Sequence, residues 1–248
     1  MNLISVKNIT KRYHTKDKEI LSLDNISFDI EDNKILGIIG PSGCGKSTLL
    51  NILTGLDKKY NGTIDKYRDI RIGYMMQNDA NLPWLTNYQN ALLGLSLKKE
   101  LTKERINDVN NLFDKYGLTE FKEMYPYNLS GGMKQRLSLI RTLAIKPNLL
   151  LLDEPFSKLD IDSRLKVSDD VYNIIKTRNI ATVLITHDIS EAITLCDKLI
   201  ILSKRPGRIT SVMDINLKGN IPSLKRKEDS FFKLYNEIWS LLEHEPGT

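Results

Sequence analysis

The chain has 248 residues, a formal net charge of +5, a pI of about 9.0 and 41% hydrophobic residues, which suits one large domain or a domain with a smaller lobe. The modest, unclustered charge does not favour a dedicated nucleic-acid-binding protein, and two distant cysteines exclude a framework of disulfides. No apolar stretch reaches the roughly 20 residues that a membrane-spanning helix needs, so we expect any work at a membrane to require another chain.

The N-terminal third is predicted to be rich in β-strands. Residues 3–9 and 26–30 alternate apolar and polar side chains, as strands with one buried face do. A wholly apolar stretch, Ile35–Ile39, follows a short turn and predicts a buried strand. Residues 62–64 and 71–75 are expected to form two further strands.

The segment Gly40–Thr48, GPSGCGKST, carries the most information because it fits the phosphate-loop pattern G-x-x-x-x-G-K-[ST]. It lies between a predicted buried strand and a predicted helix, residues 48–56. The glycines let backbone N–H groups turn toward an anion, and the helix N-terminus adds its dipole. Lys46 would contact the β- and γ-phosphates, and Ser47 would offer its hydroxyl to Mg²⁺. The predicted nucleotide contacts are Gly40, Ser42, Gly43, Cys44, Gly45, Lys46, Ser47 and Thr48.

Cys44 lies within this loop and close to a helix N-terminus. Thiol pKa values tend to fall in such places. We therefore expect a reactive thiol whose alkylation blocks nucleotide binding, and which bound nucleotide protects.

Residues 78–145 differ in character and predict a helical lobe. Apolar side chains recur at helical spacing in residues 104–116, and Gly117 suits the position just beyond a helix end. A second helix is predicted over residues 130–144. Its opening, Ser130-Gly131-Gly132, would form a second anion-binding device from a capping serine and free backbone N–H groups.

From residue 148 strands and helices alternate again, which predicts βαβ units and a parallel sheet covered by helices on both faces. The predicted elements are strands at 149–152, 181–186 and 198–203, and helices at 164–176 and 190–196. Residues 229–242 carry an amphipathic stripe. That stripe favours a helix packed on the core, with a partner-binding helix as the alternative.

The strand at 149–152 ends in two acids, Asp153 and Glu154. Carboxylates at the edge of a core are costly unless they have partners or chemistry. Beside a phosphate loop, Asp153 would hold Mg²⁺ directly or through water. Glu154 would then orient and deprotonate the attacking water as general base.

The phosphate loop, the LSGGM sequence at 129–133 and the LLLLDEP sequence at 149–155 together resemble the ATP-binding subunit of an ATP-binding cassette (ABC) transporter. The resemblance covers roughly residues 3–208, with the motifs in the family's order. It implies an α/β fold: a P-loop NTPase, RecA-like core with an N-terminal antiparallel β subdomain and an inserted α-helical subdomain. The chain, 1–248, would be a single ABC ATPase domain. Its parts would be an α/β core with the β subdomain (1–77 and 146–210), a helical subdomain with the signature motif (78–145), and a C-terminal tail and helix (211–248).

The resemblance also implies a site shared by two cassettes that pair head to tail, the second being another copy or a paralogue. Ser130, Gly131 and Gly132 would contact the γ-phosphate of an ATP bound to the partner's phosphate loop. Asp160 belongs to the segment 157–160, which would cross the dimer interface.

Three further positions match family residues. Tyr13 would stack on adenine, with an ordinary core or surface tyrosine as the alternative. Gln77 would contact Mg²⁺ and the attacking water. His187 would hydrogen-bond the γ-phosphate. Glu154, His187 and Gln77 are therefore the expected catalytic residues, and Ser47, Gln77 and Asp153 the expected metal contacts.

Two stretches, LPWLT at 82–86 and SKRPGRI at 203–209, are similar to the importer subfamily that handles nitrate, sulfonates, taurine and related small anions. Some of its members carry thiamine-precursor pyrimidines or other heterocycles instead, and that alternative stays open. The resemblance implies ATP and Mg²⁺ as cofactors, transmembrane permease subunits as partners, and an external solute-binding protein that acts indirectly. Trp84 would anchor the permease contact, unless it is an ordinary buried tryptophan.

The resemblance further implies a transport ATPase attached peripherally to the cytoplasmic face of the cell membrane, with no nucleic acid as partner. A soluble cassette ATPase that acts on nucleic acid or ribosomes is the alternative from a different class. Such proteins usually fuse two cassettes or insert long coiled coils, and this sequence contains neither.

Overall fold

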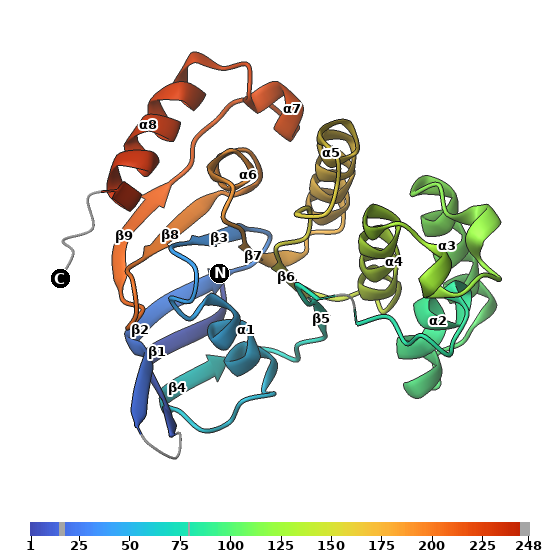
Figure 1. The fold of residues 1–248 in the computed structure, drawn as a ribbon, viewed down its shortest axis with the longest axis horizontal. Helices are drawn as coiled ribbons and strands as arrows, with labels where there is room; N and C mark the ends of the chain where they lie inside the picture. The colour runs from blue at the N-terminus through green and yellow to red at the C-terminus, as the bar shows by residue number, and fades with distance from the viewer. Residues whose placement is uncertain (15–17, 79, 244–248) are drawn as a thin grey trace.

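The computed structural model describes residues 1–14, 18–78 and 80–243, and in these ranges the strands form two sheets (Figure 1). The smaller sheet is antiparallel, in the order β2-β1-β4. Its strands are β1 (Asn2–His14), β2 (Glu19–Glu31) and β4 (Asn61–Lys66). The larger sheet has the order β5-β6-β7-β3-β8-β9, and all its neighbouring strands are parallel except β8 and β9. Its strands are β3 (Ile35–Ile39), β5 (Ile72–Met75), β6 (Leu149–Asp153), β7 (Ala181–Ile185), β8 (Lys198–Leu202) and β9 (Ile209–Asp214).

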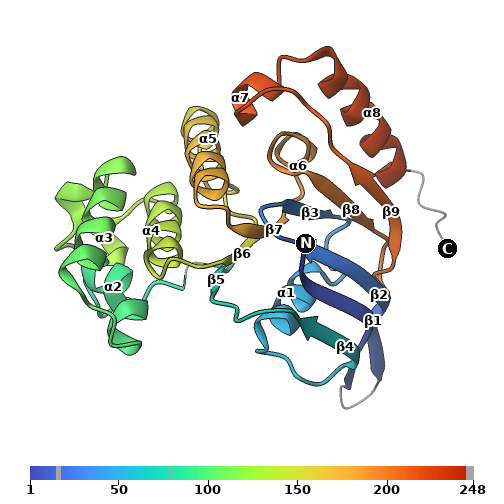
Figure 2. The same ribbon diagram turned by 180° about the vertical axis from the view of Figure 1, so that it is seen from behind.

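Helices surround the larger sheet, and both ribbon views place α2, α3 and α4 together to one side of it (Figures 1 and 2). Ser, Thr or Asp side chains begin five helices by accepting the N–H three residues on, as N-caps do. The described helices are α1 (Lys46–Thr54), α2 (Asn87–Leu97), α3 (Lys103–Lys115), α4 (Gly131–Ala144), α5 (Ile161–Thr177), α6 (Ile189–Leu195), α7 (Pro222–Lys225) and α8 (Asp229–Glu243), with 3₁₀ turns at Thr119–Phe121 and Pro126–Asn128. None of them is long and apolar enough to span a bilayer.

The parallel strands are buried on both faces, as their apolar sequences predict. Along β6, Leu149 and Leu151 pack into a cluster with α1 and the smaller sheet, whereas Leu150 and Leu152 pack into a cluster with α2 to α5. Successive side chains of a strand point to opposite faces, so one leucine run supplies both cores. A third cluster joins β8 and α6 to Phe231 and Ile238 of α8.

The strand order explains where a site can form. In the order β6-β7-β3 the three strands run parallel, so their carboxyl ends meet at one edge of the sheet. The phosphate loop follows β3, Asp153 ends β6 and His187 follows β7. Residues separated by more than a hundred positions are thereby brought to one edge.

The structure differs from the sequence-based elements mainly at the periphery. β1 and β2 are longer than the alternation indicates, because register shifts interrupt their pairing and hide the two-residue period. Asn8 and Asn25 adopt positive φ angles of 54° and 53° at such irregularities. On α8 the aromatic stripe is divided, since Phe231 is buried while Phe232 and Trp239 remain 63% and 49% exposed. The proposed boundaries at 77, 145 and 210 stay a prediction.

Candidate functional site

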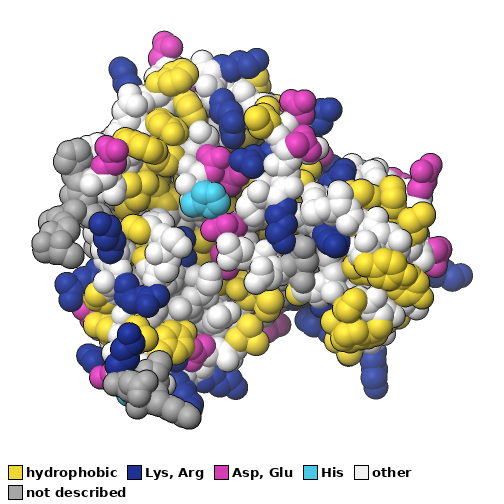
Figure 3. All heavy atoms as spheres, in the orientation of Figure 1, with side chains coloured by type: hydrophobic (Ala, Val, Ile, Leu, Met, Phe, Trp, Pro, Cys, Tyr) yellow, Lys and Arg dark blue, Asp and Glu magenta, His cyan; other side chains and the backbone are white. Residues whose placement is uncertain are grey.

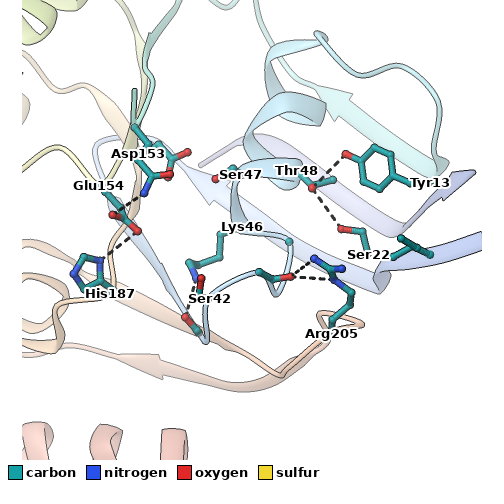
Figure 4. A pocket seen from close by; sticks show the side chains of 15 residues that line it. Tyr13, Ser22, Ser42, Lys46, Ser47, Thr48, Asp153, Glu154, His187 and Arg205 are labelled. Atoms are coloured by element: carbon teal, nitrogen blue, oxygen red, sulfur yellow. Dashed lines mark hydrogen bonds and ion pairs between the residues drawn. The ribbon is translucent and has the colours of Figure 1, made fainter. Parts of the chain in front are cut away.

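A cavity of about 440 Å³ opens at the carboxyl edge of the larger sheet (Figure 4). Twelve of the predicted site residues line it: Tyr13, Gly40, Ser42, Gly43, Gly45, Lys46, Ser47, Thr48, Gln77, Asp153, Glu154 and His187. Ile20, Ser22 and Arg205 line it as well and were not predicted. The remaining predicted residues, Cys44, Ser130, Gly131, Gly132 and Asp160, do not.

The side chain of Lys46 is folded onto its own loop. Lys46 is only 9% exposed, and its Nζ donates to the carbonyl oxygens of Gly40 at 2.8 Å and Pro41 at 2.9 Å. An ammonium carries no acceptor and needs such partners when buried. The charge of Lys46 is therefore held beside the backbone of the loop. An anion bound there could replace the two carbonyl oxygens as the partner of the ammonium.

Cys44 does not behave as the sequence suggested. It is fully buried, its Sγ lies 3.8 Å from the Nζ of Lys46, and burial raises its pKa although the ammonium opposes the change. The expectation of a lowered pKa is wrong, because the side chain packs into the core while the loop's backbone faces the cavity. Any contact of this residue with a nucleotide would come from its backbone.

Asp153 and Ser47 form the part of the cavity suited to a hard cation. Asp153 is 3% exposed, and burial raises its pKa, which the hydrogen bond from Ser47 and the charge of Lys46 only partly offset. Carboxylate and hydroxyl oxygens are donors that Mg²⁺ accepts, usually together with substrate phosphates and water. The described residues contain no group of three or more His, Cys, Asp or Glu side chains suited to a metal, so phosphate and water oxygens would have to complete the coordination.

Both carboxylate oxygens of Glu154 are held by neighbours. The Nε2 of Gln77 donates to one oxygen at 3.0 Å, and the Nδ1 of His187 lies 3.3 Å from the other. Glu154 itself has a positive φ of 50°, an uncommon backbone state for this residue type and one that clusters at functional sites. Its carbonyl accepts from the buried amide of Gln135 in α4 at 3.1 Å. The carboxylate is thus aimed into the cavity by residues from three different segments.

The support for His187 comes from the start of α6. The hydroxyl of Thr186 donates to Glu191 at 2.7 Å and accepts the N–H of Asp188 at 3.0 Å. Burial raises the pKa of Glu191, which the Thr186 hydrogen bond partly offsets. His187 projects from this fixed turn and is itself mostly exposed, with 66% of its side chain accessible.

The predicted signature residues lie on a separate, exposed surface. Ser130 caps α4 by accepting the N–H of Met133 at 3.3 Å, and Asp160 caps α5 by accepting the N–H of Ser163 at 2.9 Å, a bond that lowers the pKa of Asp160. A Cβ on Gly132 would lie 3.2 Å from the side chain of Leu159, so α4 and the loop before α5 pack closely. Within this chain, the start of α4 does not line the cavity that the phosphate loop lines.

Tyr13 and two of the unpredicted residues surround one end of the cavity. The hydroxyl of Tyr13 lies 3.3 Å from Oγ1 of Thr48 and 3.5 Å from Asp57, and the ammonium of Lys11 stands 4.6 Å from its ring centre. Ser22 lies 3.4 Å from the same Thr48 hydroxyl. No local pattern could identify Ser22, because its approach depends on how β2 packs over α1. Arg205 did belong to a recognisable stretch, SKRPGRI, but that stretch indicated a subfamily and no contact.

Comparisons with known proteins agree with this geometry. The sequence profile described as "ABC transporter" matches residues 23–157. The chain is similar to the nitrate import ATP-binding protein NrtD of Synechocystis, with 37% identity over 96% of this chain and 94% of that protein. It is also similar to the aliphatic sulfonates import ATP-binding protein SsuB of Bacillus cereus, with 37% identity over 86% of each.

Among solved structures, the chain resembles the dimeric ABC transporter cassette MJ0796, with a TM-score of 0.79, 29% identity, and coverage of 86% of this chain and 99% of that one. A second structure of MJ0796, a dimeric post-hydrolysis state bound to ADP and Pi, gives a TM-score of 0.77 and 28% identity with the same coverage. These likenesses confirm the predicted fold class.

Replacing Asp153 by Asn should stabilise the nucleotide-free protein at neutral pH. The folded-state pKa of Asp153 lies above the unfolded value of 3.8, so its charge reduces the free energy of unfolding at pH values above 3.8 and has no such effect at lower pH. Thermal unfolding should show D153N melting a few degrees higher at pH 7, with the difference vanishing toward pH 3. The matched control is D160N, since the pKa of Asp160 is shifted the other way. A D153N protein that melts below wild type at pH 7 contradicts this account.

Proposed function

This chain belongs to the ABC transporter family and is an ABC-type ATPase, and we propose that it powers the import of nitrate, a sulfonate such as taurine, or a related small anion. The solute class rests on two kinds of relative that are each 37% identical to this chain. It also rests on the LPWLT and SKRPGRI stretches. Import of a thiamine-precursor pyrimidine or another heterocycle remains the alternative.

The observation that carries the proposed chemistry is the placement of Glu154. Its two oxygens are held by Gln77 and His187 at the rim of the cavity that Lys46 and Ser47 line. A carboxylate fixed in this way can orient a water and take its proton, which makes Glu154 the general base of our proposal. Gln77 and His187 then position that base and contact the water and the γ-phosphate.

Binding of the nucleotide divides among the other lining residues. Lys46 and the backbone N–H groups of the phosphate loop would hold the phosphates, and Tyr13 would stack on the adenine. Ser47 and Asp153 would hold Mg²⁺, with Gln77 beside them. When bound, the ion would neutralise charge on the phosphate oxygens.

The catalytic unit of this proposal is a dimer. Ser130, Gly131 and Gly132 are exposed or half-exposed at the start of α4 and do not line the cavity of their own chain. We assign them to the γ-phosphate of the partner's ATP, with Asp160 at the interface between the two chains. The dimeric MJ0796 structures support this assembly.

A groove between β5 and the helices suits the membrane partner. It has a volume of about 240 Å³ and is lined by Gly73, Tyr74, Met75, Met76, Ala80, Leu93, Gly94, Leu97, Ser138, Arg141, Thr142 and Ile145. Figure 3 shows hydrophobic side chains gathered on the outer part of the helical region, and basic and acidic side chains interspersed elsewhere on that face. Leu97 is 75% exposed. We propose that permease subunits dock here, which would hold the chain at the cytoplasmic face of the membrane.

The segment 82–86 offers a second contact for the permease. Trp84 is 70% exposed, so the alternative of a buried tryptophan does not hold. The turn that presents it is rigid, because the fully buried amide of Asn90 donates to the carbonyls of Leu82, Leu85 and Thr86 at 3.0 to 3.1 Å. An exposed aromatic side chain on a fixed turn is typical of an interface anchor.

The variant E154Q should bind ATP but hydrolyse it at least about 100-fold more slowly, because the amide cannot accept the proton of the attacking water. ATP should then hold two chains together, and size-exclusion chromatography with MgATP should show a dimer that wild type forms only transiently. The control is K46A, which should remain monomeric because it binds the phosphates poorly. Hydrolysis by E154Q at the wild-type rate rules out Glu154 as the base.

The solute class can be tested in proteoliposomes that contain this chain, its co-purifying permease and the matching solute-binding protein. We expect ATP-dependent uptake of nitrate or an alkyl sulfonate, and none with K46A in place of wild type. Uptake of a pyrimidine but of neither anion would contradict the proposed solute class and favour import of a heterocycle. ATPase activity that responds to nucleic acid but not to the permease would refute the transport function.

A further inference from the structure

The hairpin between β8 and β9, residues 203–208, contacts the phosphate loop through the side chain of Arg205 (Figure 4). Ser203 closes it by donating its N–H to the carbonyl of Arg208 at 2.9 Å and its hydroxyl to the carbonyl of Pro206 at 2.9 Å. The hairpin also contacts β2, since the N–H of Gly207 donates to the backbone carbonyl oxygen of Ser22 at 2.9 Å. It is therefore a fixed structure beside the cavity.

Arg205 reaches from this hairpin to one carbonyl of the phosphate loop. Its Nε and Nη2 both donate to the carbonyl oxygen of Gly43, at 3.1 Å and 3.0 Å. Its side chain also lines the cavity. A guanidinium presents its donors as a rigid fork, and bonds from a charged donor are stronger than neutral ones. The fork therefore sets the direction of that carbonyl.

The direction of one carbonyl fixes the rest of its peptide group. The peptide unit is planar and trans, so the N–H of Cys44 must point away from the side on which Arg205 holds the Gly43 carbonyl. That N–H points into the loop and donates to the carbonyl oxygen of Pro41 at 3.3 Å, a long bond that phosphate oxygens could replace. Gly43 has a φ of 74°, and a glycine has little intrinsic preference against other orientations. The long internal bond and the external contacts of Arg205 therefore favour the same orientation of this peptide.

The fit between the hairpin and the loop is tight at a second point. A Cβ on Gly207 would lie 2.2 Å from the carbonyl oxygen of Cys44, closer than any side chain could come. Gly207 and Arg205 therefore contact successive carbonyls of the phosphate loop from the same hairpin. These two contacts hold the loop from the side of the hairpin.

We propose that Arg205 is a positioning residue for the nucleotide: it holds the Gly43–Cys44 peptide with its N–H turned inward, and so raises the affinity of the phosphate loop for phosphates. This inference rests on the proposed binding of ATP in the cavity. It assigns a role in that binding to Arg205, a residue outside the phosphate loop. An unrestrained Gly43 would populate other orientations, and the nucleotide would have to reorder them on binding.

The test is the dissociation constant of MgATP for the full chain, measured by calorimetry for wild type, R205A, R205K and R208A. We expect R205A to bind about tenfold more weakly, equivalent to about 1.4 kcal/mol, and R205K to recover only part of the loss because lysine offers a point charge in place of a fork. R208A is the matched control: Arg208 belongs to the same hairpin but pairs with Asp24, at 2.6 Å, and should change the constant less than about twofold. Melting temperatures without nucleotide should agree within about 2 °C, since Arg205 is exposed.

Three results would overturn the proposal. Wild-type affinity in R205A removes any role for the side chain. Full recovery of MgATP affinity in R205K would show that only the positive charge matters. A loss of affinity in R208A equal to that in R205A would show that loosening of the hairpin causes the effect. Failure of the wild-type chain to bind MgATP would instead refute the proposed function, so the two failures are distinguishable.

Discussion

The backbone of the phosphate loop is packed so closely against its neighbours that a Cβ atom has no room at two of its glycines. A Cβ on Gly40 would lie 2.7 Å from the carbonyl of Leu202, and one on Gly45 would lie 2.6 Å from the side chain of Leu23. These neighbours belong to β8 and β2, so both sheets meet at the loop. The loop can turn its N–H groups inward because its outer surface is held by the rest of the fold.

Charge around the cavity suits a nucleotide and a cation bound together, as we propose. Lys46 faces the loop's carbonyls, while Asp153 is buried with a raised pKa beside Glu154. A triphosphate bound alone would repel the carboxylates of Asp153 and Glu154. A cation bound alone would leave the backbone N–H groups of the phosphate loop without an anion. Under our proposal, Mg²⁺ offsets the charge of the carboxylates and ATP supplies the anion for the phosphate loop. The exposed start of α4 on a second chain then contacts the γ-phosphate.

Much of this was predictable from local sequence because the chemistry requires fixed local patterns. The phosphate loop, the acids after Leu152 and the apolar parallel strands each carry their own signal, and the resemblance of these motifs and their order to the ABC family implies the fold class. The failures came from contacts between distant segments. The burial of Cys44 reversed the direction of its pKa shift, and Arg205 reaches Gly43 only because β8 lies beside β3. Trp84 shows the same limit, since nothing in the LPWLT stretch decides whether its side chain is buried or exposed.

In the dimer that we propose, each ATP is held by one chain and contacted at its γ-phosphate by the other. The most direct test mixes a tagged chain carrying K46A with an untagged chain of normal phosphate loop, both with E154Q, and adds ATP bearing a photoreactive group on its γ-phosphate. The account predicts label on residues 130–133 of the tagged chain, which cannot bind ATP well itself. In mixed dimers recovered through the tag, label confined to residues 130–133 of the untagged chain would show a site completed within one chain and would contradict this proposal.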